Sequence, residues 1–247
     1  MSAPKERIAK IIARAGVCSR RDAERLIGEG RVTVNGQVLE TPAFLVAVSD
    51  DIRVDGKTIP RPDTTRLFLY HKPAGLVTTA RDEQGRATVF DDLPSDLPRL
   101  ISVGRLDLNT EGLLLLTNDG ALSRYLELPS TGWERLYRVR AYGTPSESDI
   151  EALGAGITYK GVHYGPVRVT LDRGRGDNSW MTISLHEGKN REIRNVMESI
   201  GLRVNRLIRV SYGPFILGDL PPGAVVEIKA AELYKKLADF FRQQRLS

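Results

Sequence analysis

The sequence contains a single cysteine, Cys18, in 247 residues, so no disulfide can form within the chain. It also lacks long hydrophobic runs: the apolar stretch at residues 113–116 is far shorter than the roughly 18 residues that cross a bilayer. No apolar segment follows the N-terminal Met-Ser-Ala-Pro-Lys, as a secretion signal would require. These absences favour a protein of the reducing cytoplasm that neither spans a membrane nor is secreted.

The patterns of a metal or nucleotide-cofactor site are missing as well. His71, His163 and His186 have no cysteine, histidine or carboxylate partner at the spacing of metal ligands. The glycines near residues 154–161 do not follow the dinucleotide-binding pattern, and no phosphate-binding Walker motif is present. We therefore expect no metal site.

The net charge is only +5, from 36 Lys and Arg against 31 Asp and Glu, but it is unevenly distributed. Residues 1–25 carry +4 and residues 189–209 carry another +4, which leaves −3 for the rest of the chain. Because phosphate contacts dominate the affinity of proteins for nucleic acids, two basic stretches on an acidic body predict a nucleic-acid partner. Two solvated helix faces would produce the same charge pattern.

Short periodic segments predict a small N-terminal unit. Apolar residues at helical spacing predict helices over residues 7–15 and 20–29. Asn35, followed by glycine, predicts a tight hairpin between two short strands. We expect this unit to cover residues 1–62 and to end in a linker at about residues 60–65.

The second and larger unit is predicted to cover residues 66–247. Its pattern alternates between strand-like and helix-like stretches, which predicts an α+β fold with a mixed, largely antiparallel sheet. The expected strands lie at residues 67–70, 113–117, 135–141, 166–171 and 180–185. The expected helices lie at residues 146–152, 190–200 and 230–245.

The N-terminal unit carries a recognisable RNA-binding pattern. Its residues are Arg7-Ile8-Ala9-Lys10, Ser19-Arg20-Arg21-Asp22 and Val34-Asn35-Gly36. They resemble the module typified by ribosomal protein S-four, which implies recognition of RNA without chemistry. Arginines at a helix N-terminus also add cationic groups to backbone N–H groups that already favour an anion. We expect four of these residues to contact RNA: Arg7, Lys10, Arg20 and Arg21.

A second motif runs from Gly104 to Gly120, where a polar turn enters an apolar strand. It places Asp107 at the mouth of a sheet. For an isolated aspartate, the favoured role is an Asx-type hydrogen bond that stabilises its own turn. This stretch, however, resembles the signature of RNA pseudouridine synthases of the RsuA and RluB type. The resemblance implies that Asp107 is the catalytic nucleophile.

Further stretches resemble the other motifs of that family, in the same order. They are His71-Lys72-Pro73-Ala74-Gly75, Tyr137-Arg138-Val139, residues 187–194 and Leu207-Ile208-Arg209. The resemblance implies that Tyr137 stacks on the target base, that Arg194 forms an ion pair with Asp107 and that Leu207 packs in the pocket. The alternatives are a core tyrosine, a purely structural salt bridge and a core leucine. A nearby guanidinium suits a carboxylate that must be ionised in order to attack carbon.

The family reaction is the isomerisation of uridine to pseudouridine within RNA. No atom is gained or lost, so the resemblance implies no cofactor. The sequence is compatible with attack by Asp107 on the ribose anomeric carbon or on ring carbon six, and with a glycal route. The target must leave its stack, and residues 78–89 form either an intruding loop or a solvated surface loop. Basic residues expected to contact RNA around this site are Arg81, Arg86, Arg105, Lys189 and Arg191.

The tail at residues 212–215 and 220–223 resembles the large-subunit RluB branch, which implies 23S rRNA or a pre-ribosomal particle as the partner. Two alternatives stay open: modification of 16S rRNA, and a non-catalytic ribosome-assembly factor that only binds RNA. The presence of Asp107, Tyr137 and Arg194 together favours an enzyme, because a binding protein has no need of all three. We expect a monomer that makes no contact with membranes.

Overall fold

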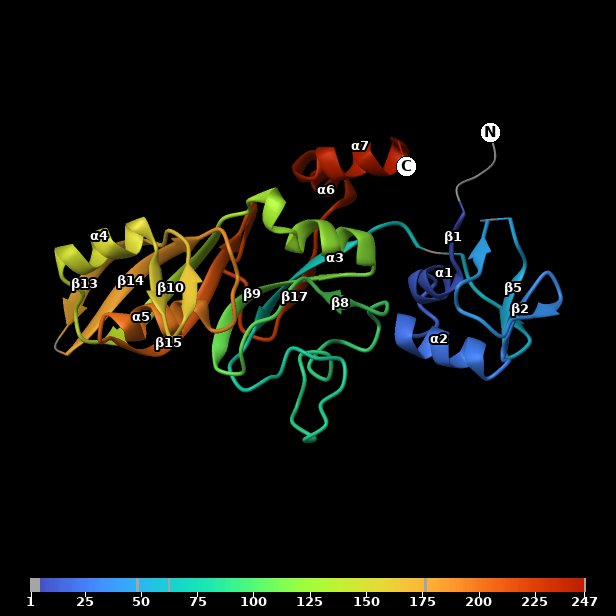
Figure 1. The fold of residues 1–247 in the computed structure, drawn as a ribbon, viewed down its shortest axis with the longest axis horizontal. Coiled ribbons are helices and arrows are strands. Elements are labelled where there is room, and N and C mark those ends of the chain that lie inside the picture. Colours follow the sequence, from blue (N-terminus) through green and yellow to red (C-terminus); the bar gives the residue numbers. More distant parts are fainter. Residues whose placement is uncertain (1–4, 48, 62, 176, 247) are drawn as a thin grey trace.

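The computed structural model describes residues 5–47, 49–61, 63–175 and 177–246, with side chains described for all of these except 173–175, 245 and 246. Helices and strands combine into an α+β architecture, which confirms the predicted fold class. A small N-terminal module, residues 6–58, precedes a larger unit built on a nine-stranded sheet (Figure 1). None of the described helices combines the length and apolarity that crossing a bilayer needs.

The N-terminal module packs two helices on a four-stranded sheet with the order β3-β2-β5-β6. The helices are α1 (Ile8–Arg14) and α2 (Arg20–Gly28). The sheet contains β2 (Val32–Val34), β3 (Gln37–Val38), β5 (Ile52–Val54) and β6 (Lys57–Thr58), while β1 (Glu6–Arg7) pairs with β4 (Leu45–Val46). The core includes Ile8, Ile12 and Ile27, which are fully buried.

Local signals in this module fold as predicted. The hydroxyl of Ser19 accepts a hydrogen bond from the backbone N–H of Asp22 at 3.1 Å, so Ser19 caps α2. Asn35 adopts the left-handed conformation, with φ of 50°, in the turn between β2 and β3. The cap leaves Arg20 and Arg21 exposed in the first turn of α2.

The large sheet has the strand order β13-β14-β10-β15-β9-β7-β17, with β16 beside β15 and β8 beside β9. Its strands are β7 (Leu67–Lys72), β8 (Ile101–Ser102), β9 (Thr110–Thr117), β10 (Arg135–Tyr142), β13 (Arg168–Arg175), β14 (Asn178–Leu185), β15 (Arg203–Tyr212), β16 (Phe215–Ile216) and β17 (Val225–Glu227). All pairs are antiparallel except β15 with β9, which is parallel and aligns Leu207 with Thr110. This pairing places the last motif of the chain beside the strand that follows Asp107.

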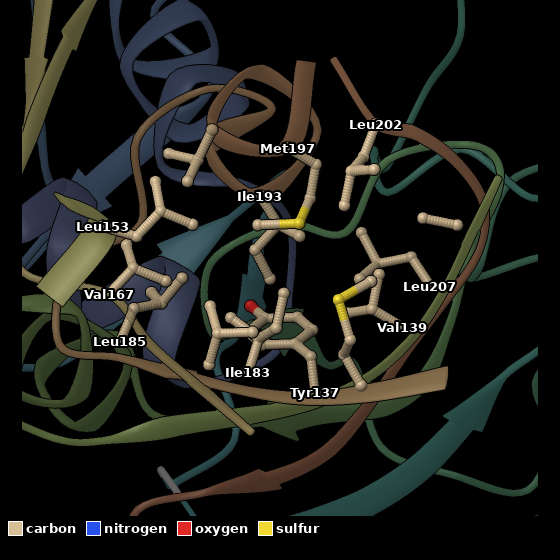
Figure 2. Close-up of a cluster of buried hydrophobic side chains, with 14 of the residues drawn as sticks. Tyr137, Val139, Leu153, Val167, Ile183, Leu185, Ile193, Met197, Leu202 and Leu207 are labelled. Atoms are coloured by element: carbon tan, nitrogen blue, oxygen red, sulfur yellow. The ribbon is translucent and has the colours of Figure 1, made fainter. Parts of the chain in front are cut away.

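Helices cover the sheet in two groups (Figure 1). They are α3 (Gly120–Glu127), α4 (Glu147–Ala155), α5 (Glu192–Ser199), α6 (Ala230–Lys236) and α7 (Ala238–Leu246), with a 3₁₀ turn at Pro129–Thr131 and a separate hairpin of β11 (Ile157–Tyr159) and β12 (Val162–Tyr164). One core cluster joins α4 and α5 to β10 and β14 (Figure 2). A second cluster joins α3, α6 and α7 to β9.

The uninterrupted apolar run in β9 has a simple structural reason. Leu113 and Leu115 pack toward α3, α6 and α7, whereas Leu114 and Leu116 pack into a third cluster with Val89 and Leu100 from the long loop after β7. Both faces of the strand are therefore buried, which removes the alternation expected of a half-exposed strand.

Two predictions about helices need correction. The helix expected over residues 230–245 is broken at Leu237, and Leu233, Leu237 and Phe240 all lie in the core. The sequence pattern also missed α3, although Asp119 caps it by accepting a hydrogen bond from the N–H of Ala121 at 2.8 Å.

Candidate active site

A cleft of about 1170 Å³ lies in the large unit, between the long loop after β7, the start of β9 and the ends of β10, β14 and β15. Three of the four predicted catalytic residues line it: Asp107, Tyr137 and Leu207. The fourth, Arg194, lies directly behind Asp107. The structure thus brings together residues that are spread over about 100 positions of the sequence.

Asp107 stands in the turn that leads into β9. The turn is closed through the backbone, since the N–H of Thr110 donates to the carbonyl of Asp107 at 3.0 Å. Within the part of the chain that the structure describes, the Asp107 carboxylate accepts no hydrogen bond, so the Asx-type role is not the one adopted. Its side chain is one-third exposed, at 33%, and therefore remains accessible from the cleft.

Two guanidinium groups face this carboxylate. Oδ2 of Asp107 lies 3.7 Å from Nη1 of Arg191 and 3.9 Å from Nε of Arg194. Arg191 is mostly exposed, whereas the Arg194 side chain is only 15% exposed. Burial lowers the pKa of Arg194 and the charge of Arg191 lowers it further, while the charge of Asp107 opposes the shift. The sequence had indicated Arg194 as the partner of Asp107, and the structure adds Arg191.

Arg194 also forms hydrogen bonds to the turn after Asp107 and to β15. Its Nη2 donates to the carbonyl of Asn109 at 3.3 Å, and its Nη1 donates to the carbonyl of Val204 at 3.2 Å. Arg191 precedes the first turn of α5 with a left-handed φ of 49°, so the chain turns sharply and both arginines reach the same carboxylate. The helix begins two residues later than predicted for this reason.

A buried lysine that received no role from the sequence holds the Asp107 turn in place. Lys72, at the end of β7, is completely buried. Its Nζ donates to the carbonyls of Pro73 at 2.9 Å, Leu108 at 3.2 Å and Thr110 at 2.9 Å. Burial lowers the pKa of Lys72 to about 8, while the charge of Asp107 opposes the shift. The available signal was a lysine at the end of a largely apolar strand.

Tyr137 and Leu207 lie on adjacent strands, β10 and β15, and both belong to the core cluster under α5 (Figure 2). Their exposures are only 8% and 5%. Both nevertheless line the cleft. Burial in the core and contact with the cleft thus occur together in both side chains, and their roles in the site stay predictions.

A buried carboxyl group also lines the cleft. Glu192, in the first turn of α5, is 4% exposed and accepts a hydrogen bond from the N–H of Lys189 at 2.8 Å. Burial raises the pKa of Glu192 to about 7, and the neighbouring Glu187 adds to the shift. No group of three or more His, Cys, Asp or Glu side chains suited to a metal ion occurs in the described residues.

Comparison with known proteins identifies the family. A sequence model of the family described as "RNA pseudouridylate synthase" matches residues 66–199, which is more than half of the chain. The chain belongs to the RNA pseudouridine synthase family. The N-terminal residues 6–52 match the model of the S4 domain, an independent match to the predicted RNA-binding module.

Relatives of known name support the same family. A protein of Rickettsia felis described as "Uncharacterized RNA pseudouridine synthase" is 49% identical over 230 residues, which cover 93% of this chain and 100% of that protein. The "Ribosomal large subunit pseudouridine synthase B" of Yersinia pestis is 40% identical over 243 residues, which cover 95% of this chain and 76% of that protein. A crystal structure described as that of a pseudouridylate synthase superposes with a TM-score of 0.66 at 25% identity and covers 94% of this chain and 99% of that chain.

The basic residues predicted to bind RNA fall into two groups in this pseudouridine synthase. Arg81, Arg86, Arg105, Lys189 and Arg191 line the cleft. Arg86 pairs with Asp82 at 2.7 Å, and Lys189 pairs with Glu187 at 2.5 Å, so these two charges are partly neutralised. No ion pair involves Arg81 or Arg105 within the described ranges.

The other group lies on the N-terminal module and does not line the cleft. Arg7, Arg20 and Arg21 are exposed, and Lys10 forms an ion pair with Glu6. Arg20 lines a second, smaller cavity together with Arg124 of α3. The two cavities share Glu127 and Pro129 in their walls, so a basic surface of the module adjoins the active-site cleft.

Proposed function

We propose that this pseudouridine synthase isomerises uridine in 23S rRNA and that Asp107 is its nucleophile. The observation that carries the assignment is the Asp107 carboxylate, which is open to the cleft, free of hydrogen bonds to the described residues and placed within 4 Å of two guanidinium groups. Such a carboxylate keeps its lone pairs available for attack while its charge is held in place. Arg194 orients it, and Lys72 fixes the turn on which it stands.

The surrounding residues fit a flipped-out uridine. Tyr137 offers a flat aromatic face beside Asp107, and Leu207 contributes an apolar wall. In the reaction the glycosidic C–N bond breaks, the uracil turns within the cleft, and ring carbon five bonds to the ribose carbon. The proton on ring carbon five is lost and the freed nitrogen gains one, so atoms balance without a cofactor. Arg81, Arg86, Arg105 and Lys189 supply cationic contacts for the RNA around the target.

The choice of 23S rRNA is supported by the relatives described as "Ribosomal large subunit pseudouridine synthase B". Those of Yersinia pestis and Salmonella typhimurium are 40% and 41% identical over 95% and 92% of this chain. The resemblance of the tail at residues 212–223 points to the same branch. The proposed partner is therefore large-subunit rRNA, free or within a pre-ribosomal particle.

Incubation of the purified protein with unmodified 23S and 16S rRNA transcripts tests this function. We expect pseudouridine at a discrete position of 23S rRNA with the native protein, none with Asp107→Asn, and native activity with Asp219→Asn, which alters an exposed aspartate. Pseudouridine in 16S rRNA alone would overturn the choice of substrate. Equal product from the Asp107→Asn protein would overturn the role of Asp107, and RNA binding without product by the native protein would favour an assembly factor.

A further inference from the structure

The cleft extends beyond Asp107 to two buried arginines that the proposed chemistry does not use. Arg135 on β10 is 8% exposed and Arg209 on β15 is 3% exposed, yet both line the cleft. The strand register pairs Arg135 with Tyr212 and Arg209 with Tyr137. Arg209 therefore lies directly across from Tyr137, the residue proposed to stack on the target base. Arg135 lies on the same strand as Tyr137, two residues before it.

Neutral acceptors hold both guanidinium groups. Nη1 of Arg135 donates to the carbonyls of His186 at 2.6 Å and Glu187 at 3.2 Å, and its Nη2 donates to the Tyr212 hydroxyl at 2.9 Å. Nε of Arg209 donates to the carbonyl of Leu113 at 2.7 Å. These bonds fix the positions of the two groups without neutralising their charges.

The Tyr212 ring lies next to both cations. The guanidinium carbons of Arg135 and Arg209 are 4.7 Å and 5.1 Å from the ring centroid. The Tyr212 hydroxyl accepts from Arg135 and in turn donates to the carbonyl of Leu126 at 2.7 Å, so two hydrogen bonds fix this end of the ring. The two arginines are thus brought to one place by a single aromatic side chain.

Neither arginine has a counter-ion. Among the residues that the structure describes, no carboxylate lies within 4.0 Å of Arg135 or Arg209, and Nη2 of Arg209 is buried without a hydrogen-bond partner. A buried cation without an anion is costly, so folding stability does not explain two of them at one end of a cleft.

The carboxylates nearest to this end are engaged elsewhere. Glu127 accepts hydrogen bonds from the N–H of Gly104 and the hydroxyl of Ser123, both at 2.8 Å. Glu187 pairs with Lys189 at 2.5 Å and accepts from the N–H of Gly165 at 2.6 Å. Neither carboxylate therefore balances the charge of Arg135 or Arg209.

We propose that Arg209 and Arg135 form a phosphate subsite, which binds a phosphodiester of the RNA strand next to the target nucleotide. The proposal rests on the proposed function only in taking RNA as the occupant. A guanidinium fork matches a phosphate geometrically, and a desolvated one binds it more strongly than a surface arginine does. The subsite places the strand so that the adjoining base lies over Tyr137 and within reach of Asp107.

The first test measures binding of fluorescein-labelled pentauridylate to Asp107→Asn protein, which reports on binding without turnover. Adding Arg209→Gln should raise the Kd at least fivefold at 50 mM salt. It should also reduce the slope of log K against log salt by about 0.7, the contribution of one phosphate contact in a single strand. Arg242→Gln, which removes an exposed arginine of α7 that pairs with Asp239, should change neither quantity. A Kd and a slope equal to those of the parent protein would overturn the subsite.

A second measurement separates phosphate from uracil as the group that Arg209 contacts. NMR titrations with uridine and with uridine 3′,5′-bisphosphate should show that Arg209→Gln weakens binding of the bisphosphate but not of the nucleoside. Equal weakening of both would assign Arg209 to the base and overturn the phosphate subsite.

Folding is checked by thermal unfolding. If Arg209→Gln is unfolded, Arg209→Met takes its place with the same expectations, because it fills a similar volume without a buried polar group. Neither titration measures pseudouridine, so failure here leaves the reaction on 23S rRNA standing, and failure of that reaction leaves the subsite standing.

Discussion

Nε of Arg194 lies 3.9 Å from Oδ2 of Asp107 and has no hydrogen-bond partner among the described residues. The separation is too long for a hydrogen bond, so the attraction is coulombic and leaves the carboxylate oxygen uncommitted. The buried donor faces a single carboxylate, which lies open to the cleft on its other side. The arginine therefore orients the Asp107 carboxylate without occupying its lone pairs.

Arg194→Met should lower the single-turnover rate on rRNA by about 100-fold, which is the usual effect of removing one buried charged donor from an active site. Arg191→Met should lower it less than tenfold, because that guanidinium is 55% exposed and screened by solvent. Circular dichroism should show both proteins folded. Equal losses for the two variants would contradict the division of roles.

Gly112→Ala should prevent the pairing of β15 with β9. Gly112 has φ of 101°, and a Cβ atom there would lie 2.3 Å from the carbonyl oxygen of Arg209. Backbone cannot yield as a side chain can, so we expect loss of activity and a fall in unfolding free energy of about 3 kcal/mol or more. Gly120→Ala is the matched control, since its Cβ would only touch Ile101 at 3.8 Å. Wild-type stability of Gly112→Ala in urea unfolding would refute the close approach.

Lys72→Met should destabilise the fold. The substitution leaves the carbonyls of Pro73, Leu108 and Thr110 without their buried lysine donor, which we expect to cost about 2–4 kcal/mol of unfolding free energy. Lys229→Met, at an exposed position, should be neutral. Urea denaturation measures both, and a Lys72→Met protein as stable as the control would mean that other donors replace the lysine.

Glu192→Gln should stabilise the protein at alkaline pH only. The pKa of Glu192 is raised to about 7 by burial, from the ordinary value of 4.5, so between these values the folded state holds a proton that the unfolded state releases. Stability therefore falls as pH rises from 4.5 to 7, and the cost is complete above pH 7. At pH 8 we expect the variant to be about 2 kcal/mol more stable than the native protein, and at pH 4.5 the difference should vanish.

Thermal unfolding across this pH range makes that comparison. Glu198→Gln, on the same helix but exposed and paired with Lys160, should show no such pH dependence. A stability difference for Glu192→Gln that is the same at pH 4.5 and pH 8 would contradict the buried, protonated carboxyl group.

Arg20→Ala combined with Arg21→Ala should weaken rRNA binding and reduce its salt dependence by about two phosphate contacts. Both side chains are exposed at the N-terminus of α2, so the fold should be unaffected. Turnover of a minimal substrate that only reaches the cleft should be unchanged. Filter binding at several salt concentrations gives the slope, and an unaltered slope would remove these arginines from the RNA interface.

The features that could be predicted from the sequence are mostly local or carried by motifs. The Ser19 cap and the turn at Asn35 depend on a few neighbouring residues, and the structure shows both as expected. The juxtaposition of Asp107 with Arg194 followed from family resemblance, because no local rule brings together residues 107 and 194.

What could not be predicted depends on tertiary packing. No role for Lys72 was predicted from the sequence, and only the folded turn shows that three carbonyls surround it. The break at Leu237 lies in a stretch with good helical periodicity, and no glycine or proline in that stretch signals it. The sequence also could not predict that Arg209 is buried without a counter-ion. That property depends on whether a carboxylate lies close to it in the folded structure.

The parallel contact between β9 and β15 also sets the order in which the enzyme can mature. It joins Thr110 to Leu207 and Gly112 to Arg209, residues about 100 positions apart. A chain emerging from its own ribosome therefore completes the N-terminal module long before β15 is synthesised, because domains fold in the order of their appearance. The cleft is therefore complete only after β15 has been made, when most of the polypeptide has been synthesised.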